Sequence, residues 1–368
     1  MKIKAAVLRV AKKPVTIEDI ELASPKEKEV LVKTAYTGFC HSDLHFIEGN
    51  VQFPLPMVLG HEASGIVAEV GPGVTSVKKG DHVVASWMVS CGECPECTSG
   101  KGHVCRRGHE RHSAGGLMDG TSRLKDANGG RLSHQTFISG FAEYMVIPEN
   151  GAVKIRDDMP LDQACFLGCC VPTGFGAVYN AAGVKPGESV AIWGMGGVGL
   201  NVVRGAKLRS ANPIIAVDLE GTKEDIAKEF GATHFINSSK EDPVPIIQKL
   251  TGGGVNYCFE AIGDPGAIEQ AFWCLTFAGK LVQIGLTPQD SKTQFPLIFA
   301  PLHCKSVEGT LYGNIRIHED IPAFADMAME GDFKLDRLIT KKFKVEEINK
   351  VVESMEKRQI IGRWVCEW

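Results

Sequence analysis

The sequence predicts an α/β protein of two unequal domains, a mostly β domain followed by one with a parallel, doubly wound sheet. The chain has 368 residues, more than a single hydrophobic core usually serves. Its first part is rich in short strand patterns, whereas from about Ala164 short apolar segments alternate with helical ones. The last segment is expected to return to the first domain. The predicted boundaries are therefore 1–170, 171–311 and 312–368.

The expected strands of the first domain show alternating Val, Ile and Tyr residues, broken by Gly or Pro. They are VLVKTAYTGFC, SGIVAEVGPGV, GDHVVASWMV and FAEYMVIPEN. Between the last two, the polar stretch from Arg106 to Gln135 is interpreted as a long functional loop.

In the second domain the pattern is strand, glycine-rich turn and helix, which is typical of a parallel sheet covered on both faces. The segments are SVAIWGMGGVGLNVVRGAKL, NPIIAVD, TKEDIAKEFGA, NYCFEAIG, the helical GAIEQAFWCLTFAGK, and LVQIG. The returning segment is expected to contain the helical VEEINKVVESMEKRQ and a final strand, GRWVCEW.

Composition excludes several classes of function. A formal charge of −4 without a basic stripe gives no reason to expect nucleic acid or a membrane surface as partner. No apolar segment approaches the roughly 20 residues that cross a bilayer, and MKIKAAVLRV is interpreted as a strand rather than a signal peptide. Twelve cysteines, of which four are clustered, favour a reducing, cytoplasmic compartment over a disulfide framework.

The clustered cysteines are Cys91, Cys94, Cys97 and Cys105. Three of them fall within CGECPEC, and the fourth follows eight residues later. Four thiolates at such spacing suit a tetrahedral structural zinc site.

A second metal site is expected upstream, because Cys40 follows a predicted strand and His61-Glu62 follows the turn PLPMVLG. A catalytic zinc takes three protein ligands and keeps one open position. Cys40 and His61 supply two of these ligands, and GCCVPTGFG offers Cys169 or Cys170 as the third. Each residue alone is compatible with ordinary packing, so the prediction depends on their joint occurrence with a nucleotide-binding pattern.

That pattern is the segment of Gly194, Gly196, Gly197, Val198 and Gly199, which lies between an apolar strand and a helix. Glycines there let a pyrophosphate approach the backbone N–H groups at a helix N-terminus. Asp218 ends the next strand, nineteen residues after Gly199. A carboxylate at that position binds the adenosine ribose and repels a 2′-phosphate, which favours NAD over NADP. Lys223 either covers the same ribose or is an ordinary surface lysine.

Five stretches together resemble the zinc-containing medium-chain alcohol dehydrogenase family, in the same order and over nearly the whole chain. They are GFCHSDLH, GHEASGIV, the four-cysteine segment, GCCVPTGFG and GMGGVG. The resemblance implies a GroES-like catalytic domain, a Rossmann domain for NAD, and two zinc ions per chain. It implies Cys40, His61 and Cys169 as the ligands of the catalytic zinc, because the family's cysteine precedes the TG pair by four positions.

The resemblance also implies roles for neighbouring residues. Ser42 and His45 would relay the alcohol proton, although Ser42 also suits a helix N-cap and His45 a surface position. Glu62 would be a carboxylate near the metal, or a buried acid paired with an arginine. Contacts with the cofactor are implied for His41, Thr173, Val198, Ile262 and Arg363.

The expected substrate pocket contains Ser42, Thr173, Trp87, Met88, Leu286 and Leu311, with the segment GLMDGTSRL at its rim. An apolar pocket suits allylic, aromatic, cyclic or other hydrophobic alcohols, primary or secondary; for Trp87, a core position is the alternative. The segment FPLIFAPLHCKSVEGTLYG resembles the family's subunit interface and favours a homodimer. The remaining alternatives are a polyol-type zinc dehydrogenase, a zinc-free quinone reductase and a non-catalytic nucleotide-binding protein.

Overall fold

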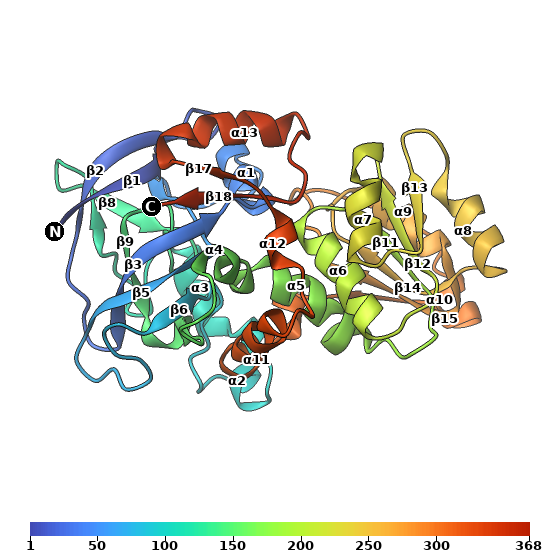
Figure 1. Ribbon diagram of the computed structural model, residues 1–368, viewed down its shortest axis with the longest axis horizontal. Coiled ribbons are helices and arrows are strands. Elements are labelled where there is room, and N and C mark those ends of the chain that lie inside the picture. Colours follow the sequence, from blue (N-terminus) through green and yellow to red (C-terminus); the bar gives the residue numbers. More distant parts are fainter. The chain divides into compact units, whose positions relative to one another are not determined.

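The computed structural model describes residues 1–368 and consists of two compact units. The first comprises Met1–Cys169 and Arg316–Trp368, and the second comprises Cys170–Ile315. Figure 1 shows the elements of both. No single helix is long and apolar enough to span a membrane, although the bent pair Leu161–Gly168 and Cys170–Ala182 together meets the requirements of length and composition.

The first unit contains a closed barrel, in which the strands follow the order β1-β2-β7-β8-β4. Their bounds are β1 Lys2–Leu8, β2 Thr16–Leu22, β4 Met57–Val58, β7 Leu124–Lys125 and β8 Arg131–His134. Buried aliphatic side chains from these strands, including Val7, Leu22 and Leu132, fill its interior. The alternation of apolar and polar residues in short strands therefore encodes a packed barrel.

A second sheet of the same unit has the order β10-β6-β5-β3-β18-β17, with β9 also paired to β3. Its strands are β3 Glu29–Gly38, β5 Ala63–Val70, β6 His82–Ala85, β9 Tyr144–Pro148, β10 Ala152–Lys154, β17 Ile339–Phe343 and β18 Arg363–Glu367. The pairing of β18 with β3 is antiparallel and joins Val365 to Gly38. This pairing brings the end of the chain beside the strand that leads to Cys40 (Figure 1).

The helices of the first unit are mostly short, and the longest is α11, with thirteen residues. They are α1 His41–Glu48, α2 Pro95–Thr98, α3 Arg106–Ser113, α4 Leu161–Ala164, α11 Ile317–Met329, α12 Leu335–Leu338 and α13 Ile348–Glu356. Helix α13 packs its apolar face, with Ile348, Val351 and Val352, into a cluster that includes Phe39 and Leu44. The cluster also contains Ile47, so the buried face of α1 packs against α13 through it.

The stretch from Arg106 to Gln135 is not the long loop that its polar composition suggested. It contains α3 and the β7–β8 hairpin, whose Leu124 and Leu132 are buried in the barrel. The Asp126 side chain closes the hairpin turn by accepting hydrogen bonds from the N–H groups of Asn128 (3.0 Å) and Gly130 (2.9 Å). Local turn chemistry therefore outweighs the scarcity of apolar residues.

The second unit is a six-stranded sheet of order β13-β12-β11-β14-β15-β16, in which every pairing is parallel. The strands are β11 Val190–Trp193, β12 Ile214–Asp218, β13 His234–Asn237, β14 Val255–Glu260, β15 Leu275–Gln283 and β16 Ser306–Gly309. The order reverses between β11 and β14, as in a doubly wound nucleotide-binding sheet. The predicted fold class is confirmed.

The helices of this unit are α5 Cys170–Gly176, α6 Gly197–Leu208, α7 Glu224–Phe230, α8 Pro243–Thr251, α9 Pro265–Trp273 and α10 Phe299–His303. One face of the sheet packs against α8 and α9, where Ile247, Ile268 and Phe272 meet Trp193 and Val217. The helix expected over 266–280 ends at Trp273, and Leu275–Gln283 is strand β15. Thr276, Phe277 and Gly279 are weak helix formers, so pairing with β14 prevails.

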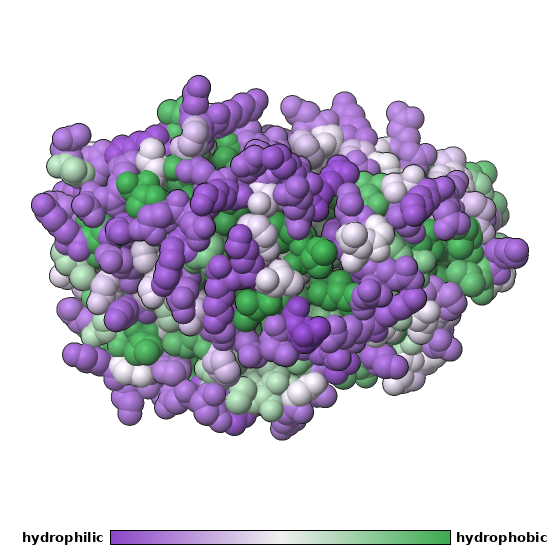
Figure 2. All heavy atoms as spheres, turned by 45° about the horizontal axis from the view of Figure 1, so that its top comes forward, coloured by the Kyte–Doolittle hydropathy of each residue, from purple (hydrophilic) through white to green (hydrophobic).

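The face drawn in Figure 2 is mostly hydrophilic and is interrupted by small groups of hydrophobic side chains. Scattered apolar residues of this kind are normal on a folded protein.

Candidate functional site

Cys40, His61 and Cys169 converge inside the first unit. Cys40 follows β3 and is the N-cap of α1, His61 directly precedes Glu62 and β5, and Cys169 follows the 3₁₀ turn Cys165–Gly168. Their two Sγ atoms and the imidazole nitrogen all lie within 4.8 Å of one another, and all three residues are buried. Cys169 Sγ is 3.6 Å from His61 Nε2.

This donor set fits zinc. Two sulfurs and one imidazole leave the fourth position of a tetrahedral ion open, which is the arrangement of a catalytic rather than a structural zinc. A hydrogen bond from the Cys169 thiol lowers the pKa of Cys40 well below its usual value despite burial, and the Arg363 guanidinium contributes to the same effect. Buried sulfur that favours the thiolate form is suited to bind a cation.

The imidazole of His61 is fixed by a carboxylate that the sequence interpretation missed. Asp43 Oδ1 lies 3.0 Å from His61 Nδ1, while Asp43 Oδ2 accepts a hydrogen bond from the Cys40 N–H at 2.9 Å. The buried Asp43 carboxylate therefore keeps the proton of His61 on Nδ1 and leaves Nε2 free to face the sulfurs. Its position three residues after Cys40, in the first turn of α1, was the available signal.

Glu62 and Arg363 form a second buried pair, which lies beside the sulfur of Cys40. Arg363 Nε lies 3.9 Å from Glu62 Oε2, and Arg363 Nη2 lies 3.6 Å from Cys40 Sγ. Arg363 Nη1 also donates to the carbonyl of Phe39 at 3.1 Å. Glu62 is thus a buried acid paired with an arginine, as the alternative interpretation had it, and it also lies close to the metal ligands.

Helix α1 carries the expected proton-relay residues. Ser42 Oγ is 3.7 Å from Cys40 Sγ, but Ser42 is not the N-cap, because Cys40 occupies that position. His41 and His45 lie one turn apart, with their rings in edge-to-face contact at 4.9 Å. His45 is half-buried rather than fully exposed, and burial lowers the pKa of its imidazole.

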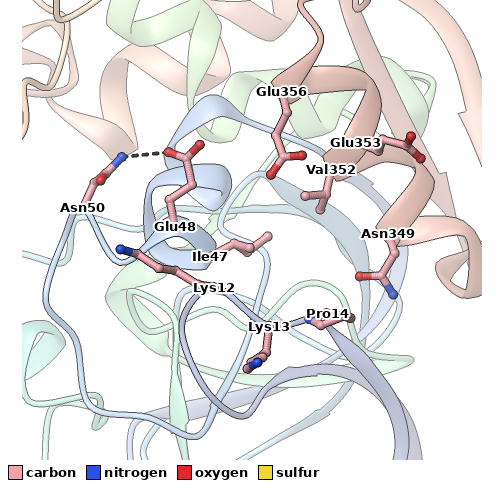
Figure 3. Close-up of a pocket in the computed structure, with 10 residues that line it drawn as sticks. All are labelled: Lys12, Lys13, Pro14, Ile47, Glu48, Asn50, Asn349, Val352, Glu353 and Glu356. Carbon is pink, nitrogen blue, oxygen red and sulfur yellow. Dashed lines mark hydrogen bonds between the residues drawn. The ribbon is translucent and has the colours of Figure 1, made fainter.

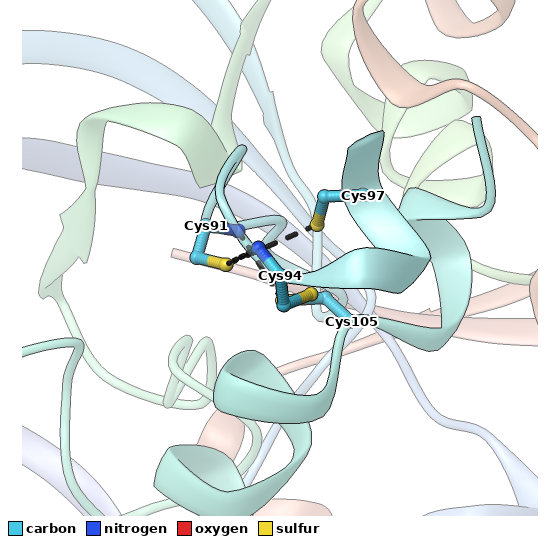
Figure 4. Close-up of side chains that lie close together, drawn as sticks. All are labelled: Cys91, Cys94, Cys97 and Cys105. Carbon is cyan, nitrogen blue, oxygen red and sulfur yellow. Dashed lines mark hydrogen bonds between the residues drawn. The ribbon is translucent and has the colours of Figure 1, made fainter. Parts of the chain in front are cut away.

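The four remaining metal-spaced cysteines form the other group. The sulfurs of Cys91, Cys94, Cys97 and Cys105 lie within 4.8 Å of one another and point toward a common centre (Figure 4). Backbone N–H groups also face these sulfurs: that of Cys91 lies 3.2 Å from Cys105 Sγ, and that of Cys94 lies 3.4 Å from Cys91 Sγ. Four sulfurs without an open position fit a structural zinc ion.

The structure decides between Cys169 and Cys170. Only Cys169 belongs to the group with Cys40 and His61. Cys170 begins α5, is fully buried, and its sulfur faces the side-chain amide of Asn201 at 4.0 Å. Cys170 is therefore part of the packing of the second unit.

The glycine-rich turn of the second unit fits a dinucleotide. A Cβ atom on Gly199 would collide with the carbonyl of Gly194, so this glycine allows α6 to pack closely after β11. A Cβ atom on Gly196 would meet nothing within 4 Å, so the backbone there is open to a ligand. It lies at the N-terminus of a twelve-residue helix, which favours phosphate. Gly197 and Val198 form the first turn of that helix.

Asp218 ends β12 and has a fixed carboxylate. Its Oδ2 accepts a hydrogen bond from the Met195 N–H at 2.6 Å, and Lys223 Nζ forms an ion pair with it at 3.0 Å. Lys223 is thus tied to the same carboxylate rather than being an isolated surface lysine. The geometry orients Asp218 at the carboxyl end of its strand, where parallel sheets bind ligands.

The other expected contact residues divide between the units. Trp87 is partly buried against a cluster that includes Val83 and Ala85, and Met88 is buried beside it. In the second unit Thr173 and Leu311 are partly buried, whereas Ile262 and Leu286 are exposed. The pairing of Ala85 with Ala63 places the segment of Trp87 beside that of His61.

A surface cavity of about 620 Å³ lies elsewhere, lined by residues of α1, α13 and the turn after β1 (Figure 3). Lysines and glutamates face it, among them Lys12, Glu48 and Glu353. It shares no residue with either cysteine group, so the chemistry of the metal donors does not extend to it.

Comparison with known proteins agrees with these features. Residues 26–157 match the family model of the alcohol dehydrogenase GroES-like domain, and residues 197–330 match that of the zinc-binding dehydrogenases. Among relatives, the chain is 38% identical to alcohol dehydrogenase class-3 of Cereibacter sphaeroides, covering 96% of this chain and 97% of that one. It is 37% identical to S-(hydroxymethyl)glutathione dehydrogenase of Paracoccus denitrificans, with 96% and 97% covered.

Solved structures of alcohol dehydrogenases are also similar to this chain over its whole length. A zinc-binding domain protein of the alcohol dehydrogenases from Burkholderia ambifaria superposes with a TM-score of 0.95 at 35% identity, over 100% of this chain and 99% of that one. Benzyl alcohol dehydrogenase from Acinetobacter calcoaceticus superposes with a TM-score of 0.94 at 34% identity, with the same coverage.

The two adjacent cysteines provide a matched test of the metal group. A Cys169→Ser variant is expected to retain one zinc ion per chain, because the three-donor group loses a thiolate while the four-cysteine group stays intact. A Cys170→Ser variant should retain two. Elemental analysis of dialysed protein measures both, and equal zinc content in the two variants would contradict the assignment.

Proposed function

Because the chain belongs to the zinc-containing medium-chain alcohol dehydrogenase family, we propose that it interconverts a hydrophobic primary or secondary alcohol with its aldehyde or ketone, using NAD. The observation that carries this proposal is the buried three-donor group of Cys40, His61 and Cys169, which occurs in one chain with a dinucleotide turn that is open at Gly196. The first group fits a metal with a vacant position, and the second fits a pyrophosphate.

Zinc and NAD are the cofactors of this family; when bound, the metal would supply a Lewis acid for the alcohol oxygen and the nicotinamide a hydride acceptor. In the proposed reaction Cys40, His61 and Cys169 hold the metal. Ser42 Oγ, close to Cys40 Sγ, accepts the substrate proton and passes it toward His45. Burial lowers the pKa of His45, which favours the neutral imidazole, the form that can accept a proton.

The cofactor residues remain proposals of the same kind. We assign the pyrophosphate to Gly194, Gly196, Gly197, Val198 and Gly199, together with His41 and Arg363. The adenosine ribose is assigned to Asp218 and Lys223, whose ion pair already lies at the end of β12. Thr173 and Ile262 are assigned to the nicotinamide half.

The substrate class is proposed to be aromatic or otherwise hydrophobic alcohols. Trp87 and Met88 are apolar residues in the segment beside that of His61, where Trp87 is partly and Met88 fully buried, and Ser42 is small. Leu286 and Leu311 are the corresponding apolar residues of the second unit. A structural relative is named for benzyl alcohol, which supports this choice. A second candidate is S-(hydroxymethyl)glutathione, because a relative of similar length is named for it.

A substrate panel separates these candidates. The purified enzyme with NAD is expected to give kcat/KM for benzyl or cinnamyl alcohol at least tenfold above that for S-(hydroxymethyl)glutathione, followed by NADH absorbance. The reverse order would replace the hydrophobic class by the glutathione adduct. A Cys40→Ser control should lose activity on both substrates, and turnover within tenfold of the parent would contradict the catalytic role of the metal group.

Cofactor preference tests Asp218. An Asp218→Ala variant is expected to bind NAD about tenfold or more weakly, because a charged hydrogen-bond acceptor for the ribose is lost. Binding of NADP should weaken less or improve, since the repulsion of its 2′-phosphate is removed. Asp225→Ala, a change of an exposed acid nearby, is the control. Equal losses for both cofactors, measured by calorimetry, would oppose the ribose assignment.

We further propose that the protein is a homodimer that pairs through the edge of the second unit. Strand β16 is an edge strand. Leu297 and Leu302, shortly before it in sequence, are 78% and 64% exposed, and Phe277 of β15, whose ring lies 4.3 Å from that of His303, is 68% exposed. Large apolar side chains beside an open strand edge favour a partner. Sedimentation equilibrium is expected to give twice the chain mass, and a single-chain mass would refute the dimer.

A further inference from the structure

Besides His61, Asp43 contacts a second buried side chain, the amide of Gln135. Gln135 Nε2 donates to Asp43 Oδ1 at 2.8 Å and lies 3.3 Å from His61 Nδ1. Asp43 Oδ1 therefore accepts hydrogen bonds from both the His61 imidazole and the Gln135 amide. Asp43 and Gln135 have no exposed surface, so water does not compete for these contacts.

The orientation of this amide is determined by its other end. The N–H of Gly60, the residue before His61, donates to Gln135 Oε1. A backbone N–H can only donate, so the oxygen must face Gly60 and the NH₂ group must face Asp43. Gln135 consequently contacts the backbone just before His61 and, through Asp43, the imidazole of the same residue.

The backbone after Gln135 is strained. Thr136, Phe137 and Ser139 have φ values of 48°, 69° and 67°, in the left-handed region that non-glycine residues seldom adopt. Such residues persist where the surroundings over-determine them, and they cluster at functional sites. Here the N–H of Gln135 donates to Val58 at 3.2 Å, and the N–H of Gly140 donates to the carbonyl of Gly60 at 2.8 Å.

We propose that Gln135 is a positioning residue for the catalytic metal. It donates a hydrogen bond to Asp43, which also contacts His61, and accepts one from the N–H of Gly60. Together these contacts fix the orientation of the His61 imidazole toward the two sulfurs. The inference rests on the proposed function and adds a residue 92 positions from Asp43. Gln135 lies on the Nδ1 side of His61, whereas Nε2 faces Cys169. Its effect is therefore on how firmly the metal is retained, more than on substrate affinity.

The test measures zinc release from the full-length holoenzyme to a chromophoric chelator. Release from the parent is expected in two phases, and the phase that is absent in Cys169→Ser belongs to the catalytic group. In Gln135→Met that phase should be about tenfold faster, because outer contacts of this kind typically contribute ten- to a hundredfold to metal affinity. The four-cysteine phase should be unchanged, which makes it an internal control.

Gln135→Asn guards against a folding failure, because it keeps a neutral amide and introduces no buried charge, while its side chain, one methylene shorter, cannot reach both Gly60 and Asp43. It should also release catalytic zinc several-fold faster. Ser122→Ala, which removes a hydrogen bond to the carbonyl of Leu132 in the same barrel, should release both ions at the parent's rates. A folded Gln135→Asn protein with parental release from the catalytic group would overturn the inference.

A double-mutant cycle distinguishes positioning from general loosening. Asp43→Asn alone should accelerate catalytic release, and adding Gln135→Met should accelerate it by a smaller factor than Gln135→Met does in the parent, because the contact of Gln135 with Asp43 is already altered while that with Gly60 is still to be lost. If the accelerations caused by the two single substitutions simply multiply in the double variant, Gln135 acts independently of Asp43, and the inference is overturned. An active parent with two zinc ions but unaffected variants would reject only Gln135, whereas a parent with zinc in the four-cysteine group alone would reject both proposals.

Discussion

Two sulfur atoms and an imidazole are buried together at Cys40, His61 and Cys169, and this arrangement constrains the rest of the first unit. Burying groups that must be deprotonated to work is costly unless a cation and hydrogen bonds compensate. The compensation here comes from Asp43 on His61 and from Arg363 beside Cys40. The fold supplies these two partners from different elements, Asp43 from α1 and Arg363 from β18.

The two metal groups of the chain differ in a way that matches their expected chemistry. The four cysteines between Cys91 and Cys105 lie in one short segment and are held by neighbouring N–H groups, so they can assemble locally. The three-donor group depends on contacts between residues far apart in sequence, such as His61 with Cys169, 108 positions later. A group of that kind exists only in the folded unit, which couples its metal affinity to the packing around it.

Much of the fold was predictable because its signals are local. The alternation with a period of two in VLVKTAYTG identifies a strand from neighbouring residues alone. The order of apolar strand, glycine-rich turn and helix identifies the nucleotide-binding turn in the same way. The stretch from Arg106 to Gln135 was misjudged, because only Leu124 and Leu132 mark its strands. The helix over 266–280 was extended too far, since the apolar residues of LTFAG suit a helix or a strand until pairing with β14 decides. Asp43 and Gln135 were missed because their partners are set by tertiary contacts.

We propose that Cys40, His61 and Cys169 together hold a metal ion that keeps one position vacant. Anomalous diffraction at the zinc edge, from crystals of active protein, locates such an ion. Two peaks per chain are expected, one among Cys91, Cys94, Cys97 and Cys105 and one between Cys40, His61 and Cys169. A single peak at the four cysteines, with activity intact, would contradict it.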